Sequence, residues 1–262
     1  MNNPPMKTRK RPWQDYFGAL GRAHHSASAQ LESSMPLLRH LDELRRRMLR
    51  AFLGVLLTTV LSFVFTRQLI DFLASPIGGS QALVSIEVTE NIAIYMRVAL
   101  LSGLVLGMPI LLYEILSFVL PGLKGNERKW LLWGVPAASL LFLGGVAFCW
   151  FVMLPAAIPF LVNFIGITTH VRPANYFNFI TTLLFWIGVS FEMPMVVALL
   201  AKLKIVTARQ LLKAWRYALV LIALLAAVIT PTVDPLNMGL VMAPLCMLYL
   251  VSVLLASLVG RS

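Results

Sequence analysis

Two acidic residues, Glu43 and Glu127, lie in strongly basic stretches, where a carboxylate can select among cationic ligands. Glu43 belongs to the segment HLDELRRR (residues 40–47), and Glu127 to the segment GLKGNERK (residues 122–129). A carboxylate can accept paired N–H···O bonds from an arginine guanidinium, so two such acids could hold two arginines. The alternative is that each acid forms a weak surface ion pair with the cations beside it, and spacing alone does not decide between the two interpretations.

Two further acids, Glu114 and Glu192, interrupt long apolar runs. An acidic side chain at the centre of a membrane helix costs about 2.5–3.5 kcal/mol on insertion scales, so such residues usually face the protein interior or a wet cavity. Glu192 lies in GVSFEMP (residues 188–194), where Pro194 has no N–H for the carbonyl group of Ser190. Each acid is either a functional group or a protonated carboxyl that is hydrogen-bonded inside the helix bundle.

The sequence contains none of the patterns that mark common catalytic sites. None of the four histidines lies in an HExxH pattern, and no GxxxxGK[ST] phosphate loop or GxSxG elbow occurs. Cys149 and Cys246 both lie in apolar runs and do not have the spacing of a metal site or a disulfide framework. We therefore expect no cofactor, no metal and no enzymatic activity. Any work that the protein does must draw on a partner or an ion gradient.

The elements that position these residues are membrane helices. The chain has 262 residues, 59% hydrophobic and 13% charged, with a mean hydropathy of +0.82. These values exclude an ordinary soluble protein, and about 20 apolar residues are needed per membrane-spanning helix. We predict an all-α membrane protein with six transmembrane helices, at residues 48–66, 96–120, 130–154, 176–200, 214–230 and 236–258, of which the last two are short. Four prolines should bend helices into a concave wall: Pro109, Pro136, Pro194 and Pro244.

The basic residues predict the orientation. The net charge is +11, and nineteen of the 22 Lys and Arg residues fall on one side of the predicted helices, against three on the other, namely Arg67, Arg97 and Arg172. By the positive-inside rule both termini are cytoplasmic, so nucleic-acid binding is not needed to explain the charge. Residues 1–35 are predicted to be a mobile cytoplasmic tail, and residues 36–262 the membrane domain. The first apolar run begins near Met48, too late for a cleavable signal peptide.

Taken in order, several motifs resemble the TatC family, the polytopic subunit of the twin-arginine protein translocase. They cover about residues 36–245, and together they are specific although each alone is weak. They are HLDELRRR (40–47), Ser75-Pro76, MPILLYE (108–114), Phe118, PGL (121–123), NER (126–128), GVSFEMP (188–194), and Thr230-Pro231 followed by Asp234.

The resemblance implies a receptor for signal peptides with consecutive arginines on folded cargo. Such a protein recruits single-span TatA and TatB partners, forms homo-oligomers within the complex, and lies in the bacterial inner membrane. Transport is then driven by the protonmotive force without ATP. The resemblance assigns signal-peptide binding to Glu43, Glu127, Arg45 and Phe118, places Glu192 on the concave face, and assigns partner-helix docking to Thr230 and Asp234.

Two departures and two alternatives accompany this interpretation. Leu116 stands where the family often has tryptophan, and Asp234 is one residue further from Thr230 than the pattern expects. An ion-coupled secondary transporter using Glu114 and Glu192 is the main alternative, although the sequence has no internal repeat. A membrane-embedded enzyme would need a nucleophile–base or metal pattern, and we find none.

Overall fold

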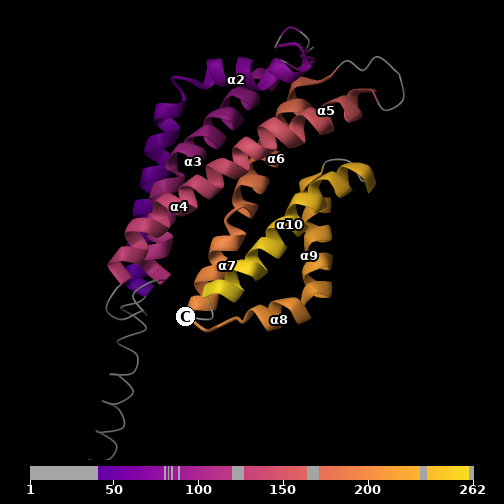
Figure 1. Ribbon diagram of the computed structural model, residues 1–262. Coiled ribbons are helices and arrows are strands. Elements are labelled where there is room, and N and C mark those ends of the chain that lie inside the picture. Colours follow the sequence, from indigo (N-terminus) through magenta and orange to yellow (C-terminus); the bar gives the residue numbers. More distant parts are fainter. Residues whose placement is uncertain are drawn as a thin grey trace, which may run out of the picture. The chain divides into compact units, whose positions relative to one another are not determined.

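The computed structural model describes residues 41–119, 127–163, 171–230 and 235–259, except residues 80, 82, 84 and 88. The described residues form helices and connecting turns, with no strand among them, which confirms the predicted all-α class (Figure 1). The chain divides into two units, Met1–Leu49 and Arg50–Ser262. The predicted tail, residues 1–35, lies outside the described residues.

The first described helix, Leu41–Ser62, is followed after three residues by the segment Thr66–Ile77, and the two are bent by 75°. This segment comprises α2 (Thr66–Ala74) and a 3-10 turn, Ser75–Ile77. No proline lies in the turn at residues 63–65; instead the hydroxyl of Tyr95 donates to the carbonyl of Phe63 at 2.8 Å. A tertiary hydrogen bond therefore stabilises this bend.

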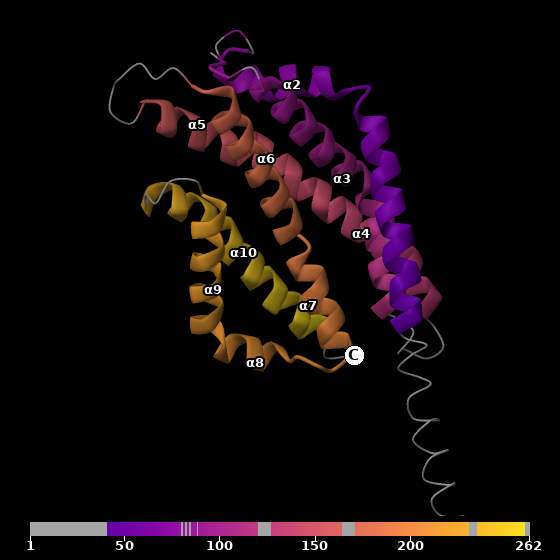
Figure 2. The ribbon, with the colours of Figure 1, turned by 180° about the vertical axis from the view of Figure 1, so that it is seen from behind.

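The remaining helices follow in chain order. They are α3 (Glu90–Val119), α4 (Glu127–Phe148), a π-helical turn (Cys149–Met153), α5 (Leu154–Asn163), α6 (Pro173–Ser190), α7 (Met193–Lys202), α8 (Ala208–Lys213), α9 (Trp215–Ile229) and α10 (Pro235–Val259). Helix α3 packs against α4 and α6, and α10 packs against α7 and α9. The second view shows α10 running beside α7 and α9 (Figure 2).

All six predicted apolar runs fall on helices, but only some of these helices are long enough to cross a bilayer. Four pass by length and composition, namely Glu90–Val119, Trp133–Pro159, Pro173–Lys202 and Asn237–Val259, and the bent pair Leu41–Ser62 and Thr66–Ile77 makes a fifth if it is one span. Helix α9 has 15 residues and is short, as predicted. The count of six crossings remains a prediction.

The predicted shortness of the last helix is wrong, since α10 has 25 residues. Pro235 does not limit this helix because it is the first residue, where no backbone N–H is needed. The helix also continues past Pro244, as α3 does past Pro109 and α4 past Pro136. At Pro194, by contrast, the chain is interrupted: α6 ends at Ser190 and α7 begins at Met193.

Small residues allow the first helix and α3 to cross closely. The hydroxyl of Thr58 donates to the carbonyl of Gly103 at 2.7 Å, and the hydroxyls of Ser62 and Ser102 are hydrogen-bonded to each other. A Cβ added to Gly103 would overlap the backbone of Thr59. Close backbone approach and interhelical hydrogen bonds are the usual means by which helices associate in lipid.

Candidate functional site

The carboxylate of Glu43 holds an arginine from the next turn of its own helix. Arg47 donates to Glu43 Oε1 from both Nε, at 3.0 Å, and Nη2, at 2.6 Å. The side chains of Arg47 and Glu43 are 18% and 37% exposed. Arg45, also predicted to bind the signal peptide, is exposed on the same helix. Glu43 is thus positioned by a continuous helix and binds a guanidinium.

A second pair with the same spacing lies beside it. Arg46 Nη2 donates to Asp42 Oδ2 at 3.0 Å, and the side chains are 75% and 57% exposed. This pair has one donated bond where the Glu43–Arg47 pair has two, and its side chains are more solvated. Because solvent screens exposed ion pairs, the Asp42–Arg46 pair is the weaker interaction of the two.

The structure does not describe the side chains of two predicted site residues. Glu127 is the first residue of α4, but its side chain and those up to residue 132 lie outside the description, and so does Asp234. The joint action of Glu43 and Glu127 therefore remains a prediction.

Glu114 lies close to one end of α3. It is five residues from Val119, about 8 Å along the helix axis, and its side chain is 7% exposed. Arg50 Nη1 lies 3.4 Å from Glu114 Oε1. The half-buried Phe118 follows one helical turn later, on the same face of α3. An acid that the sequence places within an apolar run thus has a cation opposite it, near the boundary of the apolar segment.

Glu192 lies deeper, in the break between α6 and α7. It is ten residues from Lys202, which corresponds to about 15 Å of helix. The residue is 8% exposed, and its Oε1 has no hydrogen-bond partner among the described residues. Phe191 beside it packs against the ring of Phe148, with ring centroids 5.6 Å apart. Glu192 is therefore a buried carboxyl beside an aromatic pair, and one of its oxygens has no partner among the described residues.

Thr230 closes α9 and is buried. Its hydroxyl donates to the carbonyl of Ala226 at 2.9 Å, and its backbone N–H donates to the same carbonyl group. The hydroxyl therefore satisfies a carbonyl of the last turn, in addition to any role in docking a partner helix.

The sequence did not reveal a polar network at the opposite end of α3. Glu90 is 4% exposed, and its Oε1 accepts a hydrogen bond from the backbone N–H of Ala174, in the first turn of α6, at 2.9 Å. Its Oε2 accepts from the N–H of Ile86 at 3.2 Å. Arg172 contributes a further contact, with its Nε 3.5 Å from Glu90 Oε1. Glu90 thus ties the loop before α3 to the start of α6.

Arg172 also binds Glu87 in this network. Its Nη2 donates to Glu87 Oε1 at 2.8 Å. The hydrogen bond to Glu87, followed by the charge of Glu90, raises the pKa of Arg172 above its ordinary value. The sequence predicted apolar runs that begin at residues 96 and 176, but nothing in it showed that the starts of α3 and α6 meet.

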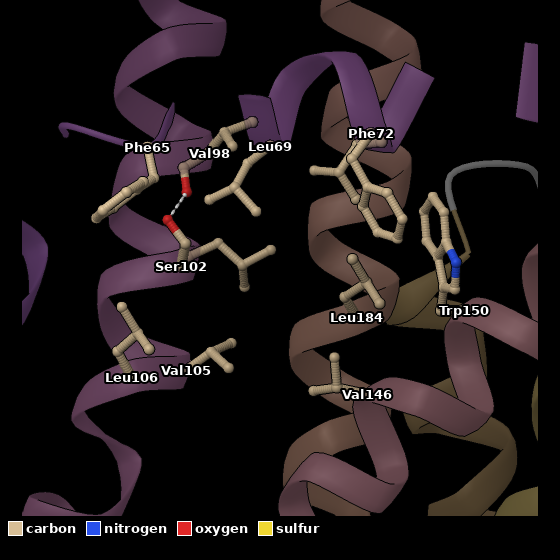
Figure 3. A pocket seen from close by; sticks show the side chains of 12 residues that line it. Phe65, Leu69, Phe72, Val98, Ser102, Val105, Leu106, Val146, Trp150 and Leu184 are labelled. Carbon is tan, nitrogen blue, oxygen red and sulfur yellow. Dashed lines mark hydrogen bonds between the residues drawn. The ribbon is translucent and has the colours of Figure 1, made fainter. Parts of the chain in front are cut away.

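An apolar hollow of about 460 Å³ lies between α2, α3, the π-helical turn and α6 (Figure 3). Phe72 of α2 stacks on Trp150 of the π-helical turn, with ring centroids 4.3 Å apart and an angle of 24° between the ring planes. Leu69, Leu101 and Leu184 line other parts of the wall, and Ser102, whose hydroxyl donates to the carbonyl of Val98, is the one polar residue of the lining. The apolar lining of the hollow suits an apolar ligand.

Comparison with known proteins identifies the family. The family model described as Sec-independent protein translocase protein (TatC) matches residues 39–244. The chain is 36% identical over 233 residues to the Sec-independent protein translocase protein TatC of Deinococcus radiodurans, covering 86% of each chain. It is 37% identical over 234 residues to the chloroplastic Sec-independent protein translocase protein TATC of Arabidopsis thaliana, covering 88% of this chain and 68% of that protein.

A solved structure agrees with the sequence comparisons. The crystal structure of the twin arginine translocase receptor TatC superimposes with a TM-score of 0.77 at 29% identity, covering 85% of this chain and 100% of that chain. The family match at residues 39–244 includes Glu43, Glu114 and Glu192. The chain therefore belongs to the TatC family and is a multi-pass membrane component of the Sec-independent protein translocase, not an enzyme.

Proposed function

We propose that this protein is the receptor for twin-arginine signal peptides on folded cargo and the scaffold on which TatA- and TatB-type single-span proteins assemble. Its sites face the cytoplasm of a bacterial inner membrane, with both termini on that side. Transport through the assembled complex uses the protonmotive force. This proposal extends the family assignment to a ligand, a set of partners and an orientation.

The guanidinium bound to Glu43 is the observation that carries the receptor role. Arg47 makes two N–H···O bonds to this carboxylate, so the local helix geometry accommodates an arginine fork. A signal-peptide arginine would make the same kind of contact. We assign the second arginine to the carboxylate of Glu127, and an apolar contact with the peptide to Phe118.

The charges explain the preference for arginine. A guanidinium presents a planar fork to a carboxylate, whereas the lysine ammonium is a compact point charge. The neighbouring cations, such as Arg45, repel positively charged peptides that do not satisfy the two acids. Arg-Arg is therefore favoured over Lys-Lys at equal net charge.

Two membrane features support the remaining parts of the proposal. The apolar hollow lined by Leu69, Phe72 and Trp150 suits the hydrophobic segment of a signal peptide. Glu192 has an oxygen without a hydrogen-bond partner among the described residues, at a depth where an unsatisfied polar group is costly. A polar side chain on a partner helix would satisfy it, and the region of Thr230 and Asp234 would contact the same partner helices.

Co-purification with a folded precursor tests the receptor role. The wild-type chain should retain a precursor whose signal carries Arg-Arg and lose most of the version with Lys-Lys. Glu43→Lys and Glu127→Lys should each abolish crosslinking to the Arg-Arg signal. Equal retention of both precursors would refute the proposed ligand.

Asp42→Lys is the matched control for Glu43→Lys. It makes the same charge change one residue away, at an acid that is paired with Arg46 and is 57% exposed. This variant should bind the Arg-Arg signal nearly as well as the wild type. If it loses binding to the same extent as Glu43→Lys, net charge and not the Glu43 carboxylate explains the result.

A further inference from the structure

The guanidinium of Arg47 binds the carboxylate of Glu43. The proposed function assigns this same carboxylate to an arginine of the signal peptide. Both described donors of Arg47, Nε at 3.0 Å and Nη2 at 2.6 Å, end on Glu43 Oε1. Both residues lie on one helix at a separation of four, with the acid on the N-terminal side, the more favourable order for such a pair. The contact is therefore local to this helix.

We propose that Arg47 is an internal competitor for Glu43, which an incoming signal arginine has to displace before it can bind. This inference rests on the receptor function proposed above. It assigns Arg47 the role of setting the affinity threshold that a signal peptide must exceed.

The thermodynamic reason is that an occupied site binds its ligand less well. The apparent dissociation constant is the intrinsic one divided by the fraction of molecules whose site is ready to bind. Helical pairs at i,i+4 contribute about 0.3–0.5 kcal/mol, enough to keep the site closed in about two thirds of molecules. Since Arg47 is only 18% exposed and donates two bonds, its pair should lie at or above this range, and we expect a weakening of about two- to five-fold.

Every peptide that binds Glu43 has to displace Arg47. This displacement weakens the binding of Arg-Arg and Lys-Lys signals by the same factor, and so leaves their ratio unchanged. A ligand that binds Glu43 only weakly then occupies few receptor molecules. A ligand that also binds the second acid has the higher affinity and still occupies most of them. Arg47 thus acts as a filter against incidental basic segments of cytoplasmic proteins.

The experiment measures the affinity of the full-length protein for a fluorescent peptide carrying an Arg-Arg signal, in detergent or nanodiscs. Arg47→Gln removes the competitor and keeps a good helix former in its place. We expect it to bind the peptide about two- to five-fold more tightly than the wild type. Arg47→Lys keeps the charge but loses the fork, and should show a smaller gain.

Arg46→Gln is the control, because Arg46 has the same charge and the same spacing to its acid, Asp42. It should bind the peptide like the wild type. An equal gain for Arg46→Gln and Arg47→Gln would overturn the inference, since the loss of one positive charge would then explain both. Weaker binding by Arg47→Gln would also overturn it, because Arg47 would then be holding Glu43 in position.

The two proposals fail in different ways. If the wild type and the Arg47 variants all ignore the Arg-Arg peptide, the receptor function itself is wrong. If the wild type binds it and Arg47→Gln shows no gain, only the competitor role of Arg47 is wrong.

Discussion

Glu192 shows at the scale of one residue how a membrane protein can carry an unsatisfied group. Its Oε1 is buried without a described hydrogen-bond partner, and the chain is interrupted beside it between Ser190 and Met193. Leaving a polar atom in this state costs stability, and natural proteins tend to keep such groups only where they are used. We therefore expect the side chain to contact another molecule more than to support the fold.

Replacing Glu192 by leucine should separate these two roles. Glu192→Leu removes the unsatisfied oxygen at similar volume, so the thermal unfolding midpoint in detergent should stay the same or rise. Co-purification of a TatB-type partner should fall about ten-fold or more, the equivalent of one lost hydrogen bond to a charged group. Glu192→Gln, which can still hydrogen-bond, should retain most of the partner. A large drop in the midpoint for Glu192→Leu would show that the carboxyl supports the fold instead.

Glu90 has the opposite character, since its carboxylate is fully used. It accepts from the backbone of Ala174 and Ile86 and lies opposite Arg172. An amide in its place cannot accept on both sides, so Glu90→Gln should lower the thermal unfolding midpoint by about 3–6 °C. Glu87→Gln is the control, because Glu87 binds Arg172 but its side chain is 64% exposed. Equal shifts for the two variants would argue against the role of the backbone contacts.

These residues also show what the sequence can and cannot reveal. The four acids Glu43, Glu127, Glu114 and Glu192 were recognisable from their surroundings in the sequence alone. Their partners were recognisable only when they lay within one helical turn, as Arg47 does. Arg50 is 64 residues from Glu114, and Ala174 is 84 residues from Glu90, so these contacts depend on the packing of distant helices.

At the scale of helices, the crossing of the first helix with α3 leaves the least space for an added Cβ among the glycines that the structure describes. The overlap at Gly103 is with the backbone of Thr59, which cannot move aside as a side chain can. Two hydroxyl groups, those of Thr58 and Ser62, make hydrogen bonds across the same interface. The two helices should therefore move as one body during transport.

A single methyl group tests this contact. Gly103→Ala should lower the unfolding free energy by about 1–3 kcal/mol, the usual cost of overpacking. Gly144→Ala is the matched control in α4, where an added Cβ meets no atom within 4 Å, and it should be neutral or slightly stabilising. Both are measured by thermal or denaturant unfolding of the purified protein. Unchanged stability of Gly103→Ala would mean that the helices can separate at little cost.

Helix positions were predictable from apolar runs, whereas helix ends and bends were not. The bend of 75° before α2 occurs without proline in residues 63–65, and depends on Tyr95, 32 residues further along the chain. The last helix was predicted to be short, but it begins at Pro235 and has 25 residues, although proline disrupts helix interiors. At a first position the same residue is favourable, and only the structure distinguishes the two contexts.

At the scale of the whole molecule, the distribution of basic residues predicts an even number of crossings with both termini in the cytoplasm. Single cysteines test this in a background lacking Cys149 and Cys246. A membrane-impermeant maleimide should label Thr168→Cys in intact cells, and should label Ser26→Cys and Ser262→Cys only after permeabilisation. Labelling of Ser26→Cys and Ser262→Cys on opposite sides would require an odd number of crossings and would refute the orientation.

The short helix α9 has a consequence for the surrounding lipid. Its 15 residues extend about 22 Å, whereas a typical hydrocarbon core is about 30 Å thick. Trp215 and the 80% exposed Tyr217 mark one end, because such aromatic rings prefer the headgroup level. With α9 as the predicted fifth crossing, we expect the acyl chains next to it to compress or tilt, and this elastic strain grows with chain length. Activity in reconstituted vesicles should accordingly depend on whether the phospholipid tails are short or long, even when headgroup and protein are the same.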